Sequence, residues 1–270
     1  MEEAAVSTKK KLLICIDGDG TLIPLVLLPD GTIATTHDII WLAIRQDPSI
    51  EHDLEAQWNL VKHLLPIGGA EMWRTVLHKM VDEKHAISFV SYSSFGNYIL
   101  RRYLEENVGL EKSFIEKNIV FVSYFPPQKK DRNDKRAHIQ KAKVALGLEG
   151  IDPNDVVLID DSRKNISAAE QDKHYTILAT PDGEHLHALM RLLTFVANEG
   201  NQKTGDENLF HSGGSSSSKD LEQLLNYSRK SPSPVIHRGP TPPVNERDIL
   251  RTSNENILNL DKNLDSLKFN

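Results

Sequence analysis

The sequence predicts an α/β fold in which a parallel β-sheet of about five strands is covered by helices on both faces. Short apolar runs alternate with longer amphipathic stretches, and carboxylates end two of these runs. The runs that we expect to be strands are KLLICI (11–16), AISFVS (86–91), IVFVSYF (119–125), DVVLID (155–160) and YTILA (175–179). Ligands of parallel sheets bind at the carboxyl ends of the strands, so residues at these ends are the first candidates for a site.

Amphipathic stretches connect the predicted strands, as the crossovers of a parallel sheet require. We expect helices over residues 69–84, 95–107, 135–146, 164–171 and 182–197. A longer insert, residues 22–66, separates the first and second strands. Its first part predicts a flap hairpin over residues 22–35 with PDG as the turn, and residues 37–66 predict two short helices that form a minimal cap.

Composition changes after the last predicted helix. Residues 198–270 are rich in Gly, Ser and Pro, and they bury too little apolar surface to offset the entropy of ordering. We therefore expect an N-terminal tail over residues 1–10, one folded domain over 11–197, and a mostly disordered C-terminal tail. In the tail, residues 220–227 and 254–267 carry leucines at helical spacing, which predicts short helices that order on a protein partner or a membrane surface.

Charge and cysteine content exclude several classes of protein. The chain has 270 residues and a formal net charge of −6, so it lacks the positive field that drives nonspecific binding to nucleic acid. Its single cysteine, Cys15, cannot form an internal disulfide. The N-terminus has no apolar signal-peptide core, and no segment approaches the roughly 18 apolar residues of a membrane span. These features predict a cytoplasmic protein.

Two carboxylates follow the first predicted strand in the stretch ICIDGDGTL. Asp17 ends the apolar run, and Asp19 can reach around the turn to the same ligand. Two ionised carboxylates at this spacing repel each other unless a divalent cation or a shared proton compensates. Gly18 and Gly20 suit a tight turn in which backbone N–H groups approach a ligand. The alternative is an Asp/Gly turn that closes an ordinary hairpin.

Polar side chains stand at the other strand ends as well. Ser91 ends the second predicted strand, and Asp160 and Asp161 follow the apolar part of the fourth. The helix after the third strand is preceded by Lys129, Lys130 and Lys135. Because the carboxyl ends of parallel strands meet at one edge, we expect these groups to converge on one cavity. There the carboxylates would hold Mg²⁺, the hydroxyl and ammonium would hold phosphate oxygens, and one carboxylate would attack phosphorus.

This ordered set resembles the haloacid dehalogenase (HAD) superfamily of aspartate-nucleophile phosphohydrolases over about residues 11–197, which implies a Rossmann-like HAD fold. ICIDGDGTL matches the first motif and VVLIDDSRKN the fourth, while a serine and a lysine match the second and third. The resemblance implies that Asp17 is a nucleophile that becomes phosphorylated and also binds Mg²⁺. It makes Asp19 the general acid and base, with its backbone carbonyl on the metal. Asp161 would be the third protein ligand, while Asp160 would orient the lysine or a metal-bound water.

The lysine of the third motif has three candidates. The family places this residue at the mouth of a helix, which favours Lys135. Lys129 and Lys130 remain alternatives, and any of the three can instead be a solvated surface residue.

The serine of the second motif also has rivals. Ser91 directly follows the apolar run and is preferred to Ser93 and Ser94, although it can instead cap the next helix. Asn165 stands where many family members carry a second Asp, so an outer contact to the metal is in question.

Other phosphate and metal chemistries lack their residues. A cysteine phosphatase needs an arginine where Thr21 stands, so Cys15 is expected to pack in the first strand. The two histidines of HLH (185–187) would point apart on a helix and do not form a metal site. DGDGT lacks the Rossmann glycine spacing and the P-loop lysine, so dehydrogenases and kinases are not supported.

The insert bears on the choice of substrate, because it is too short for a large cap domain and only a helix and a strand fit between the second and third motifs. Minimal caps in this family imply open sites that accept macromolecules. Together with the long tail, this resembles the HAD-type phosphotyrosine phosphatases among bacterial host-directed effectors, which implies export into a host cell. Trp41, Trp58, Trp73 or Tyr92 would stack on the substrate ring, or would instead pack the insert onto the core.

The sequence therefore predicts a Mg²⁺-dependent phosphomonoester hydrolase that acts on phosphorylated proteins, above all on phosphotyrosine. One alternative is a small-metabolite phosphatase or phosphotransferase that uses the same aspartates. A second is a binding module that kept the fold and lost turnover, against which the intact Asp17, Asp19 and Asp161 argue. The expected partners are a phosphoprotein or phosphopeptide substrate and a protein or membrane partner of the tail, and no nucleic acid.

Overall fold

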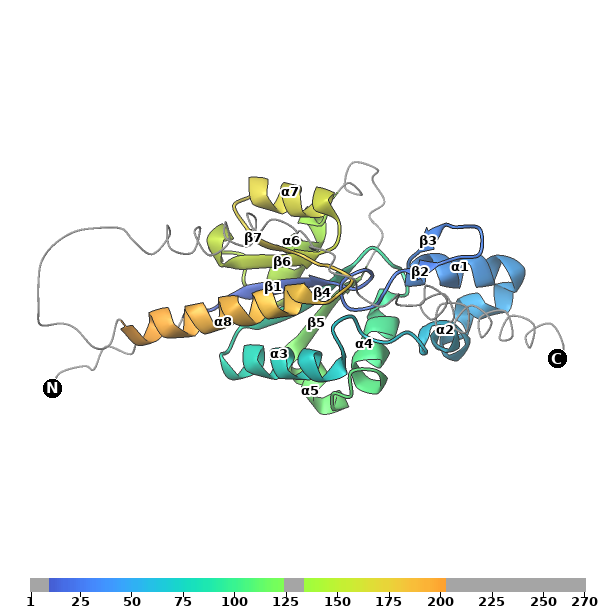
Figure 1. Cartoon of the computed structure of the whole chain (residues 1–270), viewed down its shortest axis with the longest axis horizontal. Helices are drawn as coiled ribbons and strands as arrows, with labels where there is room; N and C mark the ends of the chain where they lie inside the picture. Colours follow the sequence, from blue (N-terminus) through green and yellow to red (C-terminus); the bar gives the residue numbers. More distant parts are fainter. Residues whose placement is uncertain (1–9, 124–133, 203–270) are drawn as a thin grey trace, which may run out of the picture.

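The computed structural model describes residues 10–123 and 134–202, and its centre is a parallel sheet of five strands (Figure 1). The strands lie in the order β5-β4-β1-β6-β7, and each neighbouring pair is parallel. Their bounds are Leu13–Asp17 (β1), Ala86–Ser91 (β4), Ile119–Ser123 (β5), Val156–Asp160 (β6) and Tyr175–Leu178 (β7). The five apolar runs of the sequence are these five strands, so the predicted α/β class is confirmed.

Helices cover both faces of the sheet, since each face of a parallel sheet must be buried. One face packs against α3 (Ala70–Asp82), α4 (Gly96–Glu106), α5 (Lys112–Asn118) and α8 (Glu184–Gln202), and the other against α6 (Arg136–Ala145) and α7 (Arg163–Gln171). Successive side chains of β1 point to opposite faces of the sheet. Ile14 and Ile16 pack on the first face, and Leu13 and Cys15 pack on the second. Helix α5 is not predicted from the sequence, because its 7 residues make only about two turns.

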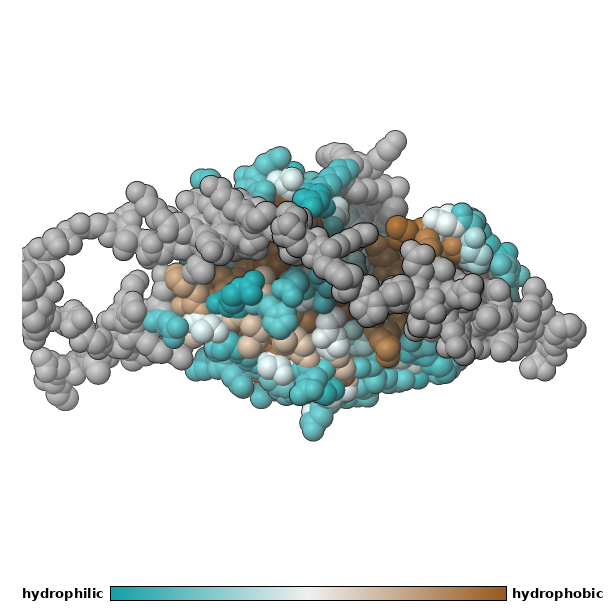
Figure 2. Space-filling view, viewed as in Figure 1, coloured by the Kyte–Doolittle hydropathy of each residue, from teal (hydrophilic) through white to brown (hydrophobic). Residues whose placement is uncertain are grey.

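The insert after β1 lies beyond the carboxyl end of the sheet (Figure 1). It contains the antiparallel pair β2 (Val26–Leu27) and β3 (Ile33–Ala34), then α1 (Thr36–Gln46), a 3-10 helix at Pro48–His52, and α2 (Leu54–Val61). Thr35 begins α1 with a capping box, in which its side chain and that of Asp38 bond reciprocally to backbone N–H groups. Figure 2 shows apolar atoms over the hairpin, where Leu27 is 57% and Ile33 65% exposed.

Several predictions fall outside the described residues. These are the end of the third strand at 124–125, Lys129 and Lys130, and the two helices over 220–227 and 254–267. Helix α8 runs to Gln202, past the predicted end of the domain at residue 197. Over the two described ranges, no helix combines the length and the apolar character that crossing a membrane needs.

Candidate active site

Three carboxylates meet at the carboxyl end of the sheet. Asp17 and Asp160 are the last residues of the neighbouring parallel strands β1 and β6, and Asp161 follows at once. Each offers an oxygen, and these oxygens all lie within 4.8 Å of one another. Asp17 is 8% exposed and Asp160 is fully buried, so water screens their charges poorly. We call these three side chains the carboxylate cluster.

Lys135 supplies positive charge to this cluster. It is the N-cap residue of α6, and its Nζ lies 2.7 Å from Oδ1 of Asp17 and 3.3 Å from the carbonyl oxygen of Val90. The ammonium also lies 4.4 Å from the ring centre of Tyr92, a cation–π contact. Lys135 is only 2% exposed. Of the three candidate lysines it is the one within the described residues, and it is not a solvated surface residue.

Gly20 lets the loop after β1 approach Asp161. Its φ of +76° lies in the left-handed region, and a Cβ atom there would lie 2.3 Å from Oδ2 of Asp161. The carbonyl of Gly18 accepts hydrogen bonds from the N–H groups of Leu22 and Ile23, which close the loop. Among the described strands, β1 pairs with β4 and β6 and not with the chain that follows it. The alternative of an Asp/Gly turn closing an ordinary hairpin is therefore wrong.

Asp19 is held by the first residue of α1. Its Oδ1 accepts from the backbone N–H of Thr36 at 3.0 Å, and its Oδ2 accepts from the Thr36 hydroxyl at 3.1 Å. Burial raises the pKa of Asp19 to about 6, although these two hydrogen bonds oppose the increase. A carboxyl group with this pKa can both give and take a proton near neutral pH, as general acid–base catalysis requires.

Asp160 is positioned by α7. Nδ2 of Asn165 lies 2.8 Å and 2.9 Å from its two oxygens, and the N–H of Ser162 donates to Oδ1 at 2.9 Å. No hydrogen bond within the described ranges joins Asp160 to Lys135, so the expected orientation of the lysine by Asp160 is not seen. The Asn165 amide thus donates to the Asp160 carboxylate, whereas an Asp at position 165, as in many family members, would repel it.

The carboxylate cluster holds more negative charge than Lys135 neutralises. Burial raises the pKa of Asp160 and of Asp161, and the charge of Asp17 raises both further. A divalent cation would relieve this repulsion, and carboxylate and carbonyl oxygens are the ligands that Mg²⁺ prefers. The residues present therefore fit Mg²⁺, with Asp160 standing beside the ligands that the sequence predicts: Asp17, Asp161 and the Asp19 carbonyl.

Ser91 ends β4 at the same edge of the sheet and is 4% exposed. Its Oγ accepts from the N–H of Ser93 at 3.1 Å, and α4 begins later, after Phe95, without a side-chain cap. Ser91 is therefore not the cap of the next helix. Oγ of Ser93 accepts from the N–H of Phe95 at 3.1 Å and lies 3.4 Å from Nδ1 of His37, while Ser94 is exposed.

The aromatic candidates divide into buried and exposed residues. Trp58 and Trp73 are 1% and 0% exposed and belong to the core, so their predicted contact with a substrate ring is wrong. Trp41 is 38% exposed on α1, and its ring centre lies 6.1 Å from those of both His37 and Phe95. Of the three tryptophans of the chain, Trp41 is thus the one whose side chain is open to solvent.

Comparison with known proteins finds no match, either among models of protein families or among curated proteins. Thr36 is absent from the sequence-based candidates, and Asn165 is considered there only for an outer contact to the metal, not as a partner of Asp160. Thr36 is 17 residues from Asp19, and a Thr-Thr pair before a helix predicts only a cap. Asn165 lies in the VVLIDDSRKN stretch, but its contact with Asp160 depends on the position of α7 relative to the end of β6, which the sequence does not give.

Proposed function

We propose that this protein is a Mg²⁺-dependent phosphomonoester hydrolase of the HAD superfamily that acts through an aspartyl-phosphate on Asp17. The observation that carries the proposal is the buried pair of Asp17 and Lys135 inside the carboxylate cluster, with Nζ 2.7 Å from Oδ1. A carboxylate oxygen is a nucleophile for phosphorus, and the contact with Lys135 fixes the position of the Asp17 side chain. The placement of this pair at the end of a central parallel strand supports a ligand site there.

The chain's own residues can perform both half-reactions. An oxygen of Asp17 attacks phosphorus, the bond from phosphorus to the leaving oxygen breaks, and Asp19 donates its proton to that oxygen. Asp19 then takes a proton from a water molecule, whose oxygen attacks phosphorus. The bond between phosphorus and Asp17 breaks, which releases phosphate and restores the carboxylate. The two hydrogen bonds from Thr36 hold Asp19 in place for both steps.

The remaining groups would bind the phosphate. Asp17, Asp161 and the backbone carbonyl of Asp19 would hold Mg²⁺, which supplies positive charge to the phosphate oxygens when bound. Lys135 adds a fixed ammonium, and Ser91 offers a hydroxyl at the same edge of the sheet.

Trapping the covalent intermediate tests the mechanism. The full chain is mixed with Mg²⁺ and a phosphotyrosine peptide, quenched in acid, digested and analysed by mass spectrometry. We expect one phosphoryl group on the fragment that contains Asp17, and in Asp19→Asn both its appearance and its loss should be slower, because the acid of the first step and the base of the second are missing. Asp17→Asn is the matched control and should carry none. A phosphoryl group on another residue, or turnover by Asp17→Asn, would overturn the mechanism.

The exposed rim favours a phosphotyrosine side chain as the substrate. The insert provides a short hairpin and two helices, and no larger domain encloses the carboxylate cluster within the described ranges. Trp41 follows Thr36, which binds Asp19, by five residues on α1. Its exposed ring lies 6.1 Å from that of His37, whose Nδ1 is 3.4 Å from Oγ of Ser93 in the loop after β4. An aromatic ring that delivers a phosphate to a recessed Asp17 can stack there, whereas phosphoserine is shorter and has no ring.

Comparative kinetics test this choice. The ratio kcat/KM is measured for phosphotyrosine peptides, phosphoserine peptides and sugar phosphates. We expect the phosphotyrosine peptides to be best, and Trp41→Ala to reduce their kcat/KM by about threefold to tenfold. Leu54→Ala, at an exposed apolar residue on α2, is the control. A sugar phosphate or nucleotide turned over tenfold faster would favour the metabolite alternative, and peptide binding without turnover would favour a binding module.

A further inference from the structure

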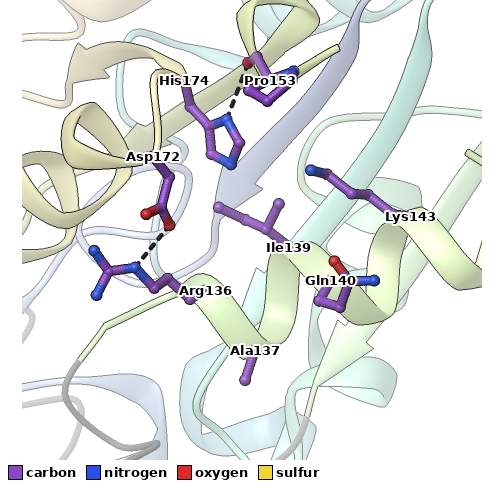
Figure 3. Close-up of a pocket in the computed structure, with 8 residues that line it drawn as sticks. All are labelled: Arg136, Ala137, Ile139, Gln140, Lys143, Pro153, Asp172 and His174. Atoms are coloured by element: carbon purple, nitrogen blue, oxygen red, sulfur yellow. Dashed lines mark hydrogen bonds and ion pairs between the residues drawn. The ribbon is translucent and has the colours of Figure 1, made fainter. Parts of the chain in front are cut away.

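A cavity lies away from the carboxylate cluster, beside α6, α7 and the start of β7 (Figure 3). Its volume is about 460 Å³, and its walls include Ile139, Lys143, Pro153 and His174. Lys143 stands two turns after Lys135, or roughly 12 Å along α6. The cavity therefore shares a helix with the proposed active site but none of its residues.

Lys143 is the residue of this cavity whose charge can bind an anion. It is 9% exposed and lines the cavity, and Figure 3 shows its side chain directed toward the same space as Ile139 and His174. No residue in the two described ranges forms a hydrogen bond or an ion pair with its ammonium. Most of the Lys143 side chain is buried, and its ammonium is reached from the cavity, so an anion in the cavity can pair with it.

The charged residues at the mouth are already paired. Arg136 donates from Nε to Asp172 at 2.7 Å and from Nη1 to Asp134 at 3.1 Å. Its Nη2 donates to the carbonyl oxygen of Ala168 at 3.1 Å. The uncompensated charge of the cavity is therefore positive and belongs to Lys143.

His174 narrows the chemistry of the ligand. Its Nδ1 lies 3.0 Å from the carbonyl oxygen of Pro153, which can only accept, so Nδ1 carries the proton and donates. Burial lowers the pKa of His174, and the charge of Lys143 lowers it further, so the ring is neutral at pH 7. In the neutral ring Nε2 is a hydrogen-bond acceptor, so a hydroxyl group of the ligand can donate to it.

We propose that this cavity binds a small oxyanion that carries a hydroxyl group, with the anionic oxygens on Nζ of Lys143 and the hydroxyl donating to Nε2 of His174. Hydrogen phosphate is the simplest such ion. The side chains of Ile139 and Pro153 leave room for an apolar part of a larger ligand. This site stands on its own geometry and does not depend on the hydrolase function.

Thermal unfolding of the full chain tests the proposal. Inorganic phosphate is compared with chloride at equal ionic strength in Mg²⁺-free buffer at pH 7. At ten times its Kd, phosphate should raise Tm by roughly 3 °C in the wild type. Lys143→Met should lose this shift. Lys141→Met is the control, because it removes the same charge from an exposed position of the same helix.

The variants separate this cavity from the active site, where phosphate can also bind. A shift that is the same in Lys143→Met and in the wild type would place the ion elsewhere and overturn the proposal. No phosphate-specific shift in the wild type would overturn it as well. If Lys143→Met does not fold, spectra of histidine-labelled wild type give the answer: phosphate should move the ring signals of His174, assigned with His174→Gln, and unmoved signals would refute the site.

Discussion

Helix α6 carries two buried lysines whose surroundings are opposite. Lys135, at its N-cap, is 2% exposed and is paired with Asp17 at 2.7 Å. Lys143, two turns later, is 9% exposed and has no partner within the described residues. The two lysine side chains are similarly buried, but their surroundings differ in charge. Negative charge is in excess around Lys135, and positive charge is in excess around Lys143.

The difference shows that a buried lysine indicates a ligand only together with its neighbours. At Lys135 the three carboxylates exceed the one ammonium, so the missing partner is a cation. At Lys143 the nearby acid, Asp172, is bonded to Arg136, so the missing partner is an anion. The two positions should therefore respond in opposite ways to the changes below.

Removing the nucleophile gives the largest expected effect. Asp17→Asn leaves Lys135 with a neutral partner and should reduce kcat by about 10⁴-fold or more, because no carboxylate can attack phosphorus. The fold should persist, since Asp160 and Asp161 still supply negative charge nearby. Steady-state kinetics and circular dichroism check this, and Mg²⁺-dependent hydrolysis at the wild-type rate would contradict the role of Asp17.

Two neighbours of the Asp17–Lys135 pair, Asp19 and Asp161, should have different roles, one in acid–base catalysis and the other in metal binding. Asp19→Asn should lower kcat by about 10²- to 10⁴-fold, because acid–base catalysis is lost, and leave the Mg²⁺ requirement unchanged. Asp161→Ala should raise the Mg²⁺ concentration for half-maximal activity by at least about tenfold, because a ligand is lost. Activity is titrated with Mg²⁺ in both variants. Equal metal dependence would show that this division of roles is wrong.

Removing the paired lysine should destabilise the protein. Lys135→Met leaves the carboxylate cluster without its counter-charge, which should lower the free energy of unfolding by about 3 kcal/mol in Mg²⁺-free buffer. Added Mg²⁺ should recover part of this loss, because the cation replaces the missing charge. Urea unfolding with and without Mg²⁺ measures both values. An unchanged free energy of unfolding would mean that Lys135 and the cluster are not coupled.

The same substitution at the unpaired lysine should act in the opposite direction. In chloride buffer without phosphate, Lys143→Met should raise Tm by roughly 1–2 °C, because it removes a charge without a partner among the described residues from the end of a mostly buried side chain. Lys141→Met, at an exposed position, provides the comparison and should change Tm by less. A drop in Tm for Lys143→Met would indicate a partner for its ammonium and remove the contrast between the two lysines.

The smallest effect is expected at the mouth of the cavity beside α6. Asp172→Asn removes the carboxylate that faces Arg136, so the cavity becomes more positive and phosphate should bind a few times more tightly. Calorimetric titration with phosphate in Mg²⁺-free buffer measures the change. Weaker binding would show that the ion contacts Asp172 or does not occupy this cavity.

The sequence alone indicated the five strands, the polar residues at their ends and most of the helices, though not α5. Apolar runs of strand length alternate with amphipathic stretches, and this local pattern predicts a parallel α/β sheet before any contact is known. Because the chain order also fixes which residues end β1 and β6, Asp17 and Asp161 could be selected as neighbours at one edge. Lys135 could be preferred because it begins a helix.

The tertiary structure alone decided which side chains have partners. Lys135 reaches Asp17 across 118 residues of sequence, and Asp19 reaches Thr36 across 17. Periodicity places a residue on a face of its own element, but pairing depends on where other elements pack. For the same reason the sequence could not show that Trp58 is buried while Trp41 is exposed. Burial and charge compensation are properties of the packed elements together, and no local pattern contains them.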